Sequence, residues 1–317
     1  MDTPITIGIS ACLTGQKVRY DGGHTRDPFL METLARFVEF LPVCPEAECG
    51  LGVPREPMRL VGDPAKPRLV TIQSKIDLTE RMEGWCRKRV RELETENLCG
   101  FIFKSRSPTS GMERVKVYSE ASTGLPQHKG VGLFARAFMD HFPLLPVEDE
   151  GRLHDPALRE NFITRIFVLR RWREAAAHQR LGSLIEFHTR HKLLLFSHSE
   201  THYRALGKFV AQAKQYPAEA LFADYEKGLM AALACKPTVK KQVNVLLHLM
   251  GYFKKVLSPA EKAELLELID QYHREYVPLL VPLTLLNHYV RKYNEAYLAG
   301  QYYLQPHPVE LKLRNHV

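Results

Sequence analysis

Residues 5–12, ITIGISAC, place a short β-rich run directly before a cysteine, and this arrangement sets the interpretation of the first half of the chain. Runs of similar character recur and alternate with amphipathic segments. Strands are predicted at 5–10, 40–46, 67–74, 98–103, 115–118 and 143–148, and helices at 29–40, 77–97 and 130–142. Strands that alternate with helices of this length are typical of parallel βαβ units. Residues 1–150 are therefore predicted to form an α/β domain with a parallel or mostly parallel, Rossmann-like sheet.

Polar and sulfur-containing side chains follow three of these predicted strands. Cys12 follows the first strand, Cys44 follows the second, and Ser105, Ser107 and Ser110 follow the strand at 98–103. In a parallel sheet, ligands bind beyond the carboxyl ends of the strands. The three groups are therefore expected to meet at one rim.

The character of the sequence changes near residue 150, where an acidic segment leads into Asp155 and Pro156, a typical helix start. Residues 151–317 are predicted to form an all-α domain. Lys and Arg number 20 against 21 Asp and Glu in residues 1–150, but 24 against 15 in residues 151–317. This asymmetry indicates one half that does chemistry and another that binds an anionic partner, nucleic acid above all. A solvated basic helical surface explains the same charge equally well.

No segment of the sequence has the character of a membrane span or a secretory leader. The longest apolar run, 277–286, is shorter than the about 20 residues that a spanning helix needs, and prolines interrupt it. The first ten residues lack a basic start followed by a long apolar stretch. A cytoplasmic location is therefore expected, and the six cysteines should be reduced there.

Cys44 and Cys49 lie five residues apart in a loop of proline, glutamate and glycine. Structural zinc normally takes four ligands, often from CxxC pairs, and the sequence contains no such pair. Iron-sulfur clusters accept less regular spacings, and a cubane held by three cysteines leaves one iron open. Ordinary loop cysteines account for the spacing equally well.

Three segments of the first half resemble the signature segments of the bacterial thiouracil desulfidase family (TudS). They are SACLTGQKVRYDGG at 10–23, PVCPE with GLGVPREP at 42–57, and KSRSPTSGMERVKVY at 104–118. The second half, with 186–199 and 303–317, is similar to the helical domain of the tRNA 4-thiouridine desulfidases (RudS). The resemblance implies an enzyme that removes sulfur from a thiolated uracil, with 4-thiouridine in tRNA as the expected substrate.

The resemblance further implies a 4Fe-4S cluster held by three protein cysteines, with one open iron that takes the sulfur of the substrate. By position the first two ligands are Cys12 and Cys44. The third falls at Ser110, where the family commonly has cysteine. Cys49 is therefore predicted to supply the third sulfur; a labile cluster and an engineered serine are the alternatives. The implied reaction is a non-redox hydrolysis of the C–S bond, in which the open iron acts as a Lewis acid.

Three residues are predicted to act in that reaction. Glu46 is the candidate general base or acid, since a carboxylate beside a partly buried cluster can have its pKa tuned toward neutrality. Ser107 would position the pyrimidine or relay a proton, and Asp21 is a further candidate that could equally be a turn residue in YDGG. The predicted substrate contacts are Arg19, Tyr20, Ser105 and Ser110.

The helical half is predicted to dock tRNA, with lysine and arginine neutralising phosphates. The predicted phosphate contacts are Arg170, Arg171, Arg173, Lys240, Lys241, Lys254 and Lys255. Two other interpretations stay open at this point. The substrate could be a small thiolated pyrimidine, as free base or 4-thiouridine monophosphate, with the helical half serving oligomerisation. Alternatively, the chain could be an iron-sulfur protein that binds nucleic acid as a regulator without catalysis.

Overall fold

The segment ITIGIS forms β1 (Thr6–Ser10), an inner strand of a four-stranded sheet with the order β2-β1-β5-β8. Its neighbours are β2 (Glu39–Val43), β5 (Gly100–Phe103) and β8 (Val147–Asp149). All three pairings are parallel; Thr6 faces Glu39, for example, and Ile7 faces Gly100. The carboxyl ends of these strands therefore lie along one edge of the sheet.

A second four-stranded sheet has the order β4-β3-β6-β7 and mixes strand directions. It consists of β3 (Met58–Asp63), β4 (Lys66–Thr71), β6 (Val115–Tyr118) and β7 (Gln127–Gly130). β3 pairs with β4 and β6 with β7 in antiparallel fashion, while β3 and β6 are parallel. The predicted strands at 67–74 and 115–118 thus belong to this second sheet, and β3 and β7 were not predicted.

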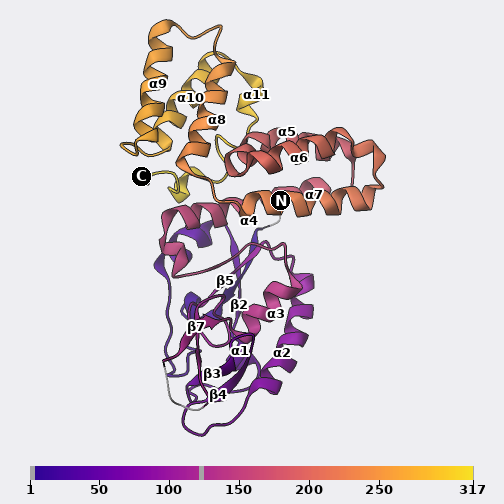
Figure 1. The fold of residues 1–317 in the computed structure, drawn as a ribbon, viewed down its shortest axis with the longest axis vertical. Helices are drawn as coiled ribbons and strands as arrows, with labels where there is room; N and C mark the ends of the chain where they lie inside the picture. Colours follow the sequence, from indigo (N-terminus) through magenta and orange to yellow (C-terminus); the bar gives the residue numbers. More distant parts are fainter. Residues whose placement is uncertain (1–3, 121–124, 317) are drawn as a thin grey trace. The chain divides into compact units, whose positions relative to one another are not determined.

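The helices α2 (Thr79–Glu92) and α3 (Leu133–His141) pack against each other and against β5 (Figure 1). Phe101 and Phe103 alternate along β5, so both side chains emerge on the face that α3 covers with Phe134 and Phe138. Gly8 of β1 makes room for this aromatic cluster, because a Cβ there would lie 2.2 Å from the Phe101 ring. Burial of these rings joins the sheet to its helices.

The predicted helix at 29–40 is wrong in extent and type. The structure has a single π-helical turn at Phe29–Thr33 and a 3-10 turn at Leu34–Arg36, while residues 39 and 40 belong to β2. Glu39 belongs to a strand because its backbone pairs with Thr6 of β1. Sheet hydrogen bonding therefore ends the helix earlier than its apolar spacing indicated.

The structure is a computed structural model that describes residues 4–120 and 125–316, and the chain divides into two compact units, Met1–Asp155 and Pro156–Val317. The second unit is helical, so an α/β part followed by an all-α part confirms the predicted fold class (Figure 1). Its helices are α4 (Pro156–Ala176), α5 (Leu181–His198), α6 (Glu200–Ala211), α7 (Ala218–Ala234), α8 (Val239–Tyr252), α9 (Pro259–His273), α10 (Leu280–Lys292) and α11 (Ala296–Ala299). The α/β unit also contains the short helix α1 (Pro45–Glu48).

Trp172 of α4 lies at the centre of the helical unit and is completely buried. Its indole contacts the rings of Phe187, Phe222 and Tyr225 and donates a hydrogen bond to Glu226 Oε2 at 3.0 Å. Aromatic groups of this size contribute strongly to core stability. Within the described part of the chain, no helix combines the length and the apolar character needed to cross a bilayer.

Candidate active site

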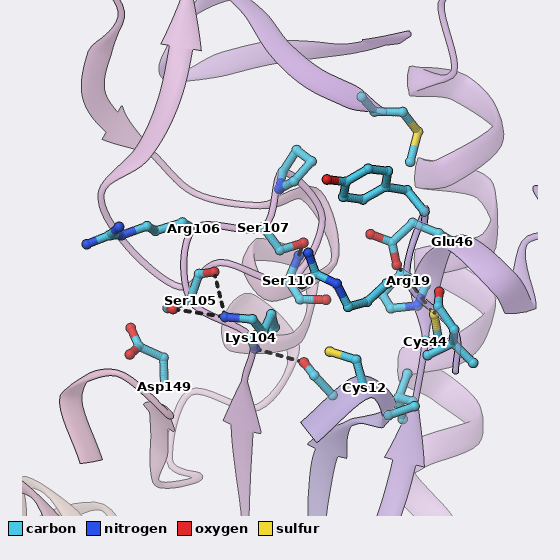
Figure 2. A pocket seen from close by; sticks show the side chains of 18 of the residues that line it. Cys12, Arg19, Cys44, Glu46, Lys104, Ser105, Arg106, Ser107, Ser110 and Asp149 are labelled. Carbon is cyan, nitrogen blue, oxygen red and sulfur yellow. Dashed lines mark hydrogen bonds between the residues drawn. The ribbon is translucent and has the colours of Figure 1, made fainter. Parts of the chain in front are cut away.

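A cavity of about 700 Å³ lies beyond the carboxyl ends of β1, β2 and β5. Cys12, Cys44 and Ser110 all line it, as do Ser105 and Ser107 (Figure 2). The groups that follow three separate strands in the sequence are thus brought together at a single cavity. Its size falls within the range of about 300–1,000 Å³ that is usual for small-molecule sites.

Cys12 reaches the cavity because β1 ends at Ser10 and the chain turns at once into a 3-10 helix, Ala11–Thr14. The turn closes at Gly15, whose φ of 95° is in the left-handed region that favours glycine. The Ser10 hydroxyl accepts the backbone N–H of Lys104 at 2.8 Å. This bond connects the end of β1 to the start of the serine loop, residues 104–111.

Cys44 lies between β2 and α1, and Pro45 occupies the first position of that helix. The Cys44 N–H donates to Glu48 Oε1 at 2.8 Å, which fixes the start of the helix. Glu46, in the first turn of α1, lines the same cavity as Cys44. The Cys44 thiol lies 3.5 Å from Glu46 Oε2, so sulfur and carboxylate are adjacent.

The Glu46 carboxylate is held by groups from three segments and is only 13% exposed. Arg55 Nη2 lies 3.7 Å from its Oε2, and the Thr109 hydroxyl donates to its Oε1 at 2.6 Å. Thr109 in turn contacts the Ser107 hydroxyl at 3.0 Å. Glu46 is therefore well placed to exchange a proton with a ligand in the cavity, with two hydroxyls close enough to relay it.

Backbone hydrogen bonds from the first turn of α3 fix the position of the serine loop. The N–H groups of Phe134 and Ala135 donate to the Thr109 carbonyl at 2.9 and 3.1 Å. Gly132 permits this approach, since a Cβ there would lie 2.5 Å from the carbonyl carbon and oxygen of Thr109. Ser107 Oγ accepts the Ser110 N–H at 3.1 Å, so Ser107 also caps the loop from within.

Burial raises the pKa of the Cys44 thiol to about 12, with the neighbouring Glu46 charge adding to the effect. Burial likewise raises the pKa of Cys12. Both sulfurs are therefore thiols at neutral pH in the protein without a metal. Thiols of this kind become thiolates when a metal binds, since metal binding releases their protons.

The donor set along the cavity falls one thiol short of the three that the resemblance implies. Among the described residues, no cluster of three or more His, Cys, Asp or Glu side chains could hold a metal ion. Cys49 does not line the cavity; its thiol lies against the Glu46 carbonyl at 3.5 Å and packs on the core beneath α2. Position 110 does line it, but offers a hydroxyl. The lining therefore brings the hydroxyl of Ser110, and not the thiol of Cys49, to the same cavity as Cys12 and Cys44.

The other predicted site residues of the α/β unit differ in placement. Arg19 and Tyr20 line the cavity, with the Arg19 guanidinium 5.5 Å from the Tyr20 ring centre. The Ser105 hydroxyl lines it too, but donates to Glu150 Oε1 at 2.7 Å. Asp21 does not line the cavity; its exposed carboxylate accepts the Gly23 N–H at 3.0 Å, which favours the turn interpretation. This contact and the Arg19 charge lower the pKa of Asp21.

Three of the predicted phosphate contacts in the helical unit have partners within that unit. Arg171 donates to His191 Nε2 at 3.2 Å and to the Pro306 carbonyl at 2.9 Å, and it stacks on Tyr302. Arg170 pairs with Glu174, and Lys241 donates to the His198 carbonyl. Arg173 is half-buried, whereas the exposed members of the predicted set are Lys240, Lys254 and Lys255.

Sequence reasoning missed several residues that line the cavity. Arg55 lines the cavity and lies beside Glu46, from which it is separated by a short stretch of sequence. Thr109, which is buried and distant in sequence, donates to the same carboxylate. Arg55 is the cation of the GLGVPREP segment, so its charge in a glycine-rich loop was the available signal. The remaining missed lining residues with charge are Lys104, Arg106, Glu113, Arg114, Asp149 and Arg152.

Comparison with known proteins separates the two halves of the chain. Residues 7–150 match the family model described as 2-thiouracil desulfurase, and residues 192–308 match one described as a protein of unknown function (DUF1722). Among solved structures, a [4Fe-4S]-dependent thiouracil desulfidase, TudS, is similar, with 27% identity over 49% of this chain and 97% of that chain and a TM-score of 0.40.

The residues that line the cavity lie almost entirely within the α/β segment that matches the 2-thiouracil desulfurase model. The chain is also 34% identical to the uncharacterized protein YbgA of Escherichia coli (strain K12) over 158 residues, 49% of this chain and 94% of that protein. The chain therefore belongs to the family of YbgA. The helical half matches a model of unknown function, so its expected likeness to the tRNA 4-thiouridine desulfidases stays a prediction.

Proposed function

We propose that this protein is a desulfidase that converts a thiolated uracil to uracil and sulfide, with 4-thiouridine in tRNA as its principal substrate. The observation that carries the proposal is the convergence of Cys12, Cys44 and Glu46 on one cavity in a domain that matches the 2-thiouracil desulfurase model. The overall reaction is hydrolytic: water adds to the carbon that bears sulfur, the C–S bond breaks, and hydrosulfide leaves. Atoms balance without an oxidant or reductant.

Glu46 is the proposed catalytic residue for the proton transfers of this reaction. Its Oε2 lies beside the Cys44 thiol, and its Oε1 accepts from Thr109, so the carboxylate is oriented before a ligand enters. It would take a proton from the attacking water and return one to the departing sulfur. Ser107, through Thr109, completes a hydroxyl pair that holds the pyrimidine or carries a proton.

Cys12 and Cys44 would hold an iron-sulfur cluster, with Ser110 as the third donor. When bound, such a cluster supplies a Lewis acid for the substrate sulfur. The proposal for two thiols and a hydroxyl rests on the lining of the cavity, where all three positions meet.

The tRNA partner is proposed from the basic helical unit. Lys240, Lys254 and Lys255 are exposed and close in sequence on and after α8, so they can meet a phosphate backbone. Replacement of all three by glutamine should weaken binding to unmodified tRNA and lower the slope of log affinity against log salt. An unchanged slope would place the tRNA surface elsewhere.

The enzymatic test is sulfide release by anaerobically reconstituted protein. Substrates are thiolated tRNA, 4-thiouridine monophosphate, 4-thiouridine and 2-thiouracil, assayed side by side. We expect sulfide from at least one of them, and loss of release in Cys12→Ser and Cys44→Ser. Cys235→Ser, in the helical unit, is the matched control and should keep full activity. Wild-type protein that binds iron but releases sulfide from none of these substrates would refute the proposed function.

A further inference from the structure

A second cavity, of about 220 Å³, lies wholly within the helical unit. Residues of α4, α5, α8 and α9 line it, together with the C-terminal segment that follows α11. Its volume is below the range of about 300–1,000 Å³ that is usual for drug-sized ligands. It is nevertheless several times the volume of about 30 Å³ that one water molecule occupies in the liquid. The cavity therefore has room for a small organic molecule.

Three polar side chains of this lining are more than nine-tenths buried: Thr164, Gln242 and Tyr272 are 3%, 5% and 7% exposed. Gln242 Oε1 accepts the Tyr303 hydroxyl at 2.8 Å, so the amide nitrogen of Gln242 is left to donate to a ligand. The hydroxyls of Thr164 and Tyr272 make no hydrogen bond to any residue that the structure describes. Buried polar groups are nearly always paired, so these three groups need a partner inside the cavity.

Asn161 supplies a hydrogen-bonding group of the opposite kind. Its Nδ2 donates to the Leu233 carbonyl at 3.1 Å, which leaves Oδ1 as an acceptor for a ligand. Burial raises the pKa of Tyr272 to about 12, so its hydroxyl keeps a proton to donate at neutral pH. The lining thus offers donors on Gln242 and Tyr272 and an acceptor on Asn161.

The charged side chains of the lining balance each other. Arg314 is 7% exposed, and its Nε donates to Glu160 Oε1 at 2.9 Å. Lys236 and Glu275 line the cavity as well and are both exposed, so the cavity opens to solvent at these residues. With histidine neutral, the two cations and two carboxylates leave no net charge. A neutral ligand is therefore favoured over an anion or a cation.

The other walls of the cavity are largely apolar. Leu194, Val239, Val277 and Leu279 contribute side chains from α5, from α8 and from the segment between α9 and α10. Apolar walls with a few placed polar groups are typical of small-molecule sites. A pyrimidine base matches this lining, because it is a neutral single ring with apolar faces and an edge that carries two acceptors and a donor.

We propose that the cavity of the helical unit binds a pyrimidine base, whose acceptors take hydrogen bonds from Gln242 and Tyr272 and whose N–H donates to Asn161. No residue lines both this cavity and the one that contains Cys12 and Cys44. The inference therefore goes beyond the proposed function and does not depend on sulfide release.

The base has two possible sources: a free base or nucleoside, and an unpaired nucleotide of an RNA. Both present the same ring edge to the lining, so the chemistry of recognition is shared. Uridine and a short single-stranded oligouridylate are the two probes that distinguish the sources.

Two variants remove a hydroxyl from the lining and keep the shape of the side chain: Tyr272→Phe and Thr164→Val. Since no described residue bonds either hydroxyl, both variants should unfold at a urea midpoint no lower than that of the wild type. Tyr289→Phe is the matched control, because Tyr289 is a tyrosine of the same unit that is 2% exposed and does not line the cavity.

The experiment measures binding through the stability of the helical unit. A ligand that binds the folded state raises the urea midpoint, and the rise at several ligand concentrations gives the affinity. Trp172 lies in the helical unit and Trp85 in the α/β unit, so a Trp85→Phe background limits the fluorescence to the helical unit. Uridine should raise the midpoint of the Trp172 transition, and ribose should not. A midpoint that neither uridine nor oligouridylate raises would overturn the proposed site.

The variants then assign the binding to this cavity. Tyr272→Phe and Thr164→Val should each lower the affinity about fivefold, the factor that one neutral hydrogen bond contributes, while Tyr289→Phe keeps the wild-type affinity. Wild-type affinity in both cavity variants would overturn the proposal.

The two probes assign the source of the base. Tighter binding of oligouridylate than of uridine, weakened by the same variants, assigns the cavity to a nucleotide of an RNA. A rise with uridine and none with oligouridylate assigns it to a free base or nucleoside. Failure of the sulfide assay with a retained uridine response would remove the proposed function and leave this site in place.

Discussion

Lowering the pH from 6.5 to 4.5 should destabilise the helical unit strongly, because it contains four buried histidines. Burial lowers the pKa of His188 and of His198 to about 4 and that of His307 to about 3. Burial also lowers the pKa of His191 well below its ordinary value. Each of these side chains is at most 7% exposed. The folded state therefore resists protonation in a range where the unfolded chain accepts it.

Proton linkage gives the direction and the magnitude of this change in the free energy of unfolding. Between the ordinary histidine pKa of about 6.5 and the folded values, the unfolded state binds more protons, so stability rises with pH and is lost as pH falls. Near pH 5.5 each buried imidazole contributes a slope of about 1.2 kcal/mol per pH unit. Over the two units from 6.5 to 4.5, one histidine removes about 2 kcal/mol, so three remove about 6. A domain is stable by about 5–15 kcal/mol, so this loss brings the unit close to unfolding.

The assay is urea unfolding of the full chain at several pH values. The sequence contains two tryptophans, Trp85 and Trp172, one in each unit. Trp85→Phe leaves the buried Trp172 as the fluorescent probe of the helical unit. His198→Gln should reduce the pH slope by about one proton, whereas His273→Gln, at an exposed position of α9, should leave it unchanged. A Trp172 transition that keeps the same urea midpoint from pH 7 to pH 5 would refute the reasoning.

Three further predictions concern the α/β unit. Ser110→Cys should raise the amount of iron retained per chain after anaerobic reconstitution, because it adds a thiolate at the cavity. Cys49→Ser should leave the amount of iron unchanged. A smaller amount of iron in Cys49→Ser would restore Cys49 as the third ligand. Gly132→Ala should lower the free energy of unfolding by about 1–3 kcal/mol because its Cβ collides with the serine loop, whereas Gly182→Ala, in open space within α5, should be neutral or stabilising in the same denaturation assay. Glu46→Gln should lower kcat for sulfide release by about 10²–10⁴-fold with little change in thermal stability, and activity within a few-fold of wild type would remove Glu46 from the mechanism.

The positions of the cysteines and serines at one rim could be predicted from the sequence because the rule behind them is local. A short β-rich run followed by a polar loop identifies a strand end, and parallel strands share the edge at which they end. Cys12, Cys44 and Ser110 could therefore be predicted to lie at one edge of the sheet, and all three line the same cavity.

The second sheet could not be predicted in the same way. β7, with the sequence QHKG, has three exposed residues and no alternation of apolar and polar side chains, so it exists as a strand because its backbone pairs with β6. β3 joins β4 through antiparallel pairing across a short turn but also pairs with β6, which is distant in sequence. Pairings set by distant segments leave little local signal.

Arg171 lies on α4, a helix with many apolar residues in its sequence. Buried side chains surround α4 on several sides, including Phe162, Ile166, Val168 and Trp172. A helix that buries residues on several faces is largely enclosed by its neighbours. A cation on such a helix is more readily placed as a packing and hydrogen-bonding group than as a free phosphate contact, and the contacts of Arg171 agree with this.

The bond from the Lys104 N–H to the Ser10 hydroxyl has a mechanical consequence for the sheet. It fastens β1 to the loop after β5, so the two central strands should open and close as one cooperative segment. A ligand that contacts both Cys12 and Ser110 would connect the segment after β1 to the serine loop a second time. Loading of the cavity should then slow amide hydrogen exchange in β1 and β5 in step, while α2 exchanges at its former rate.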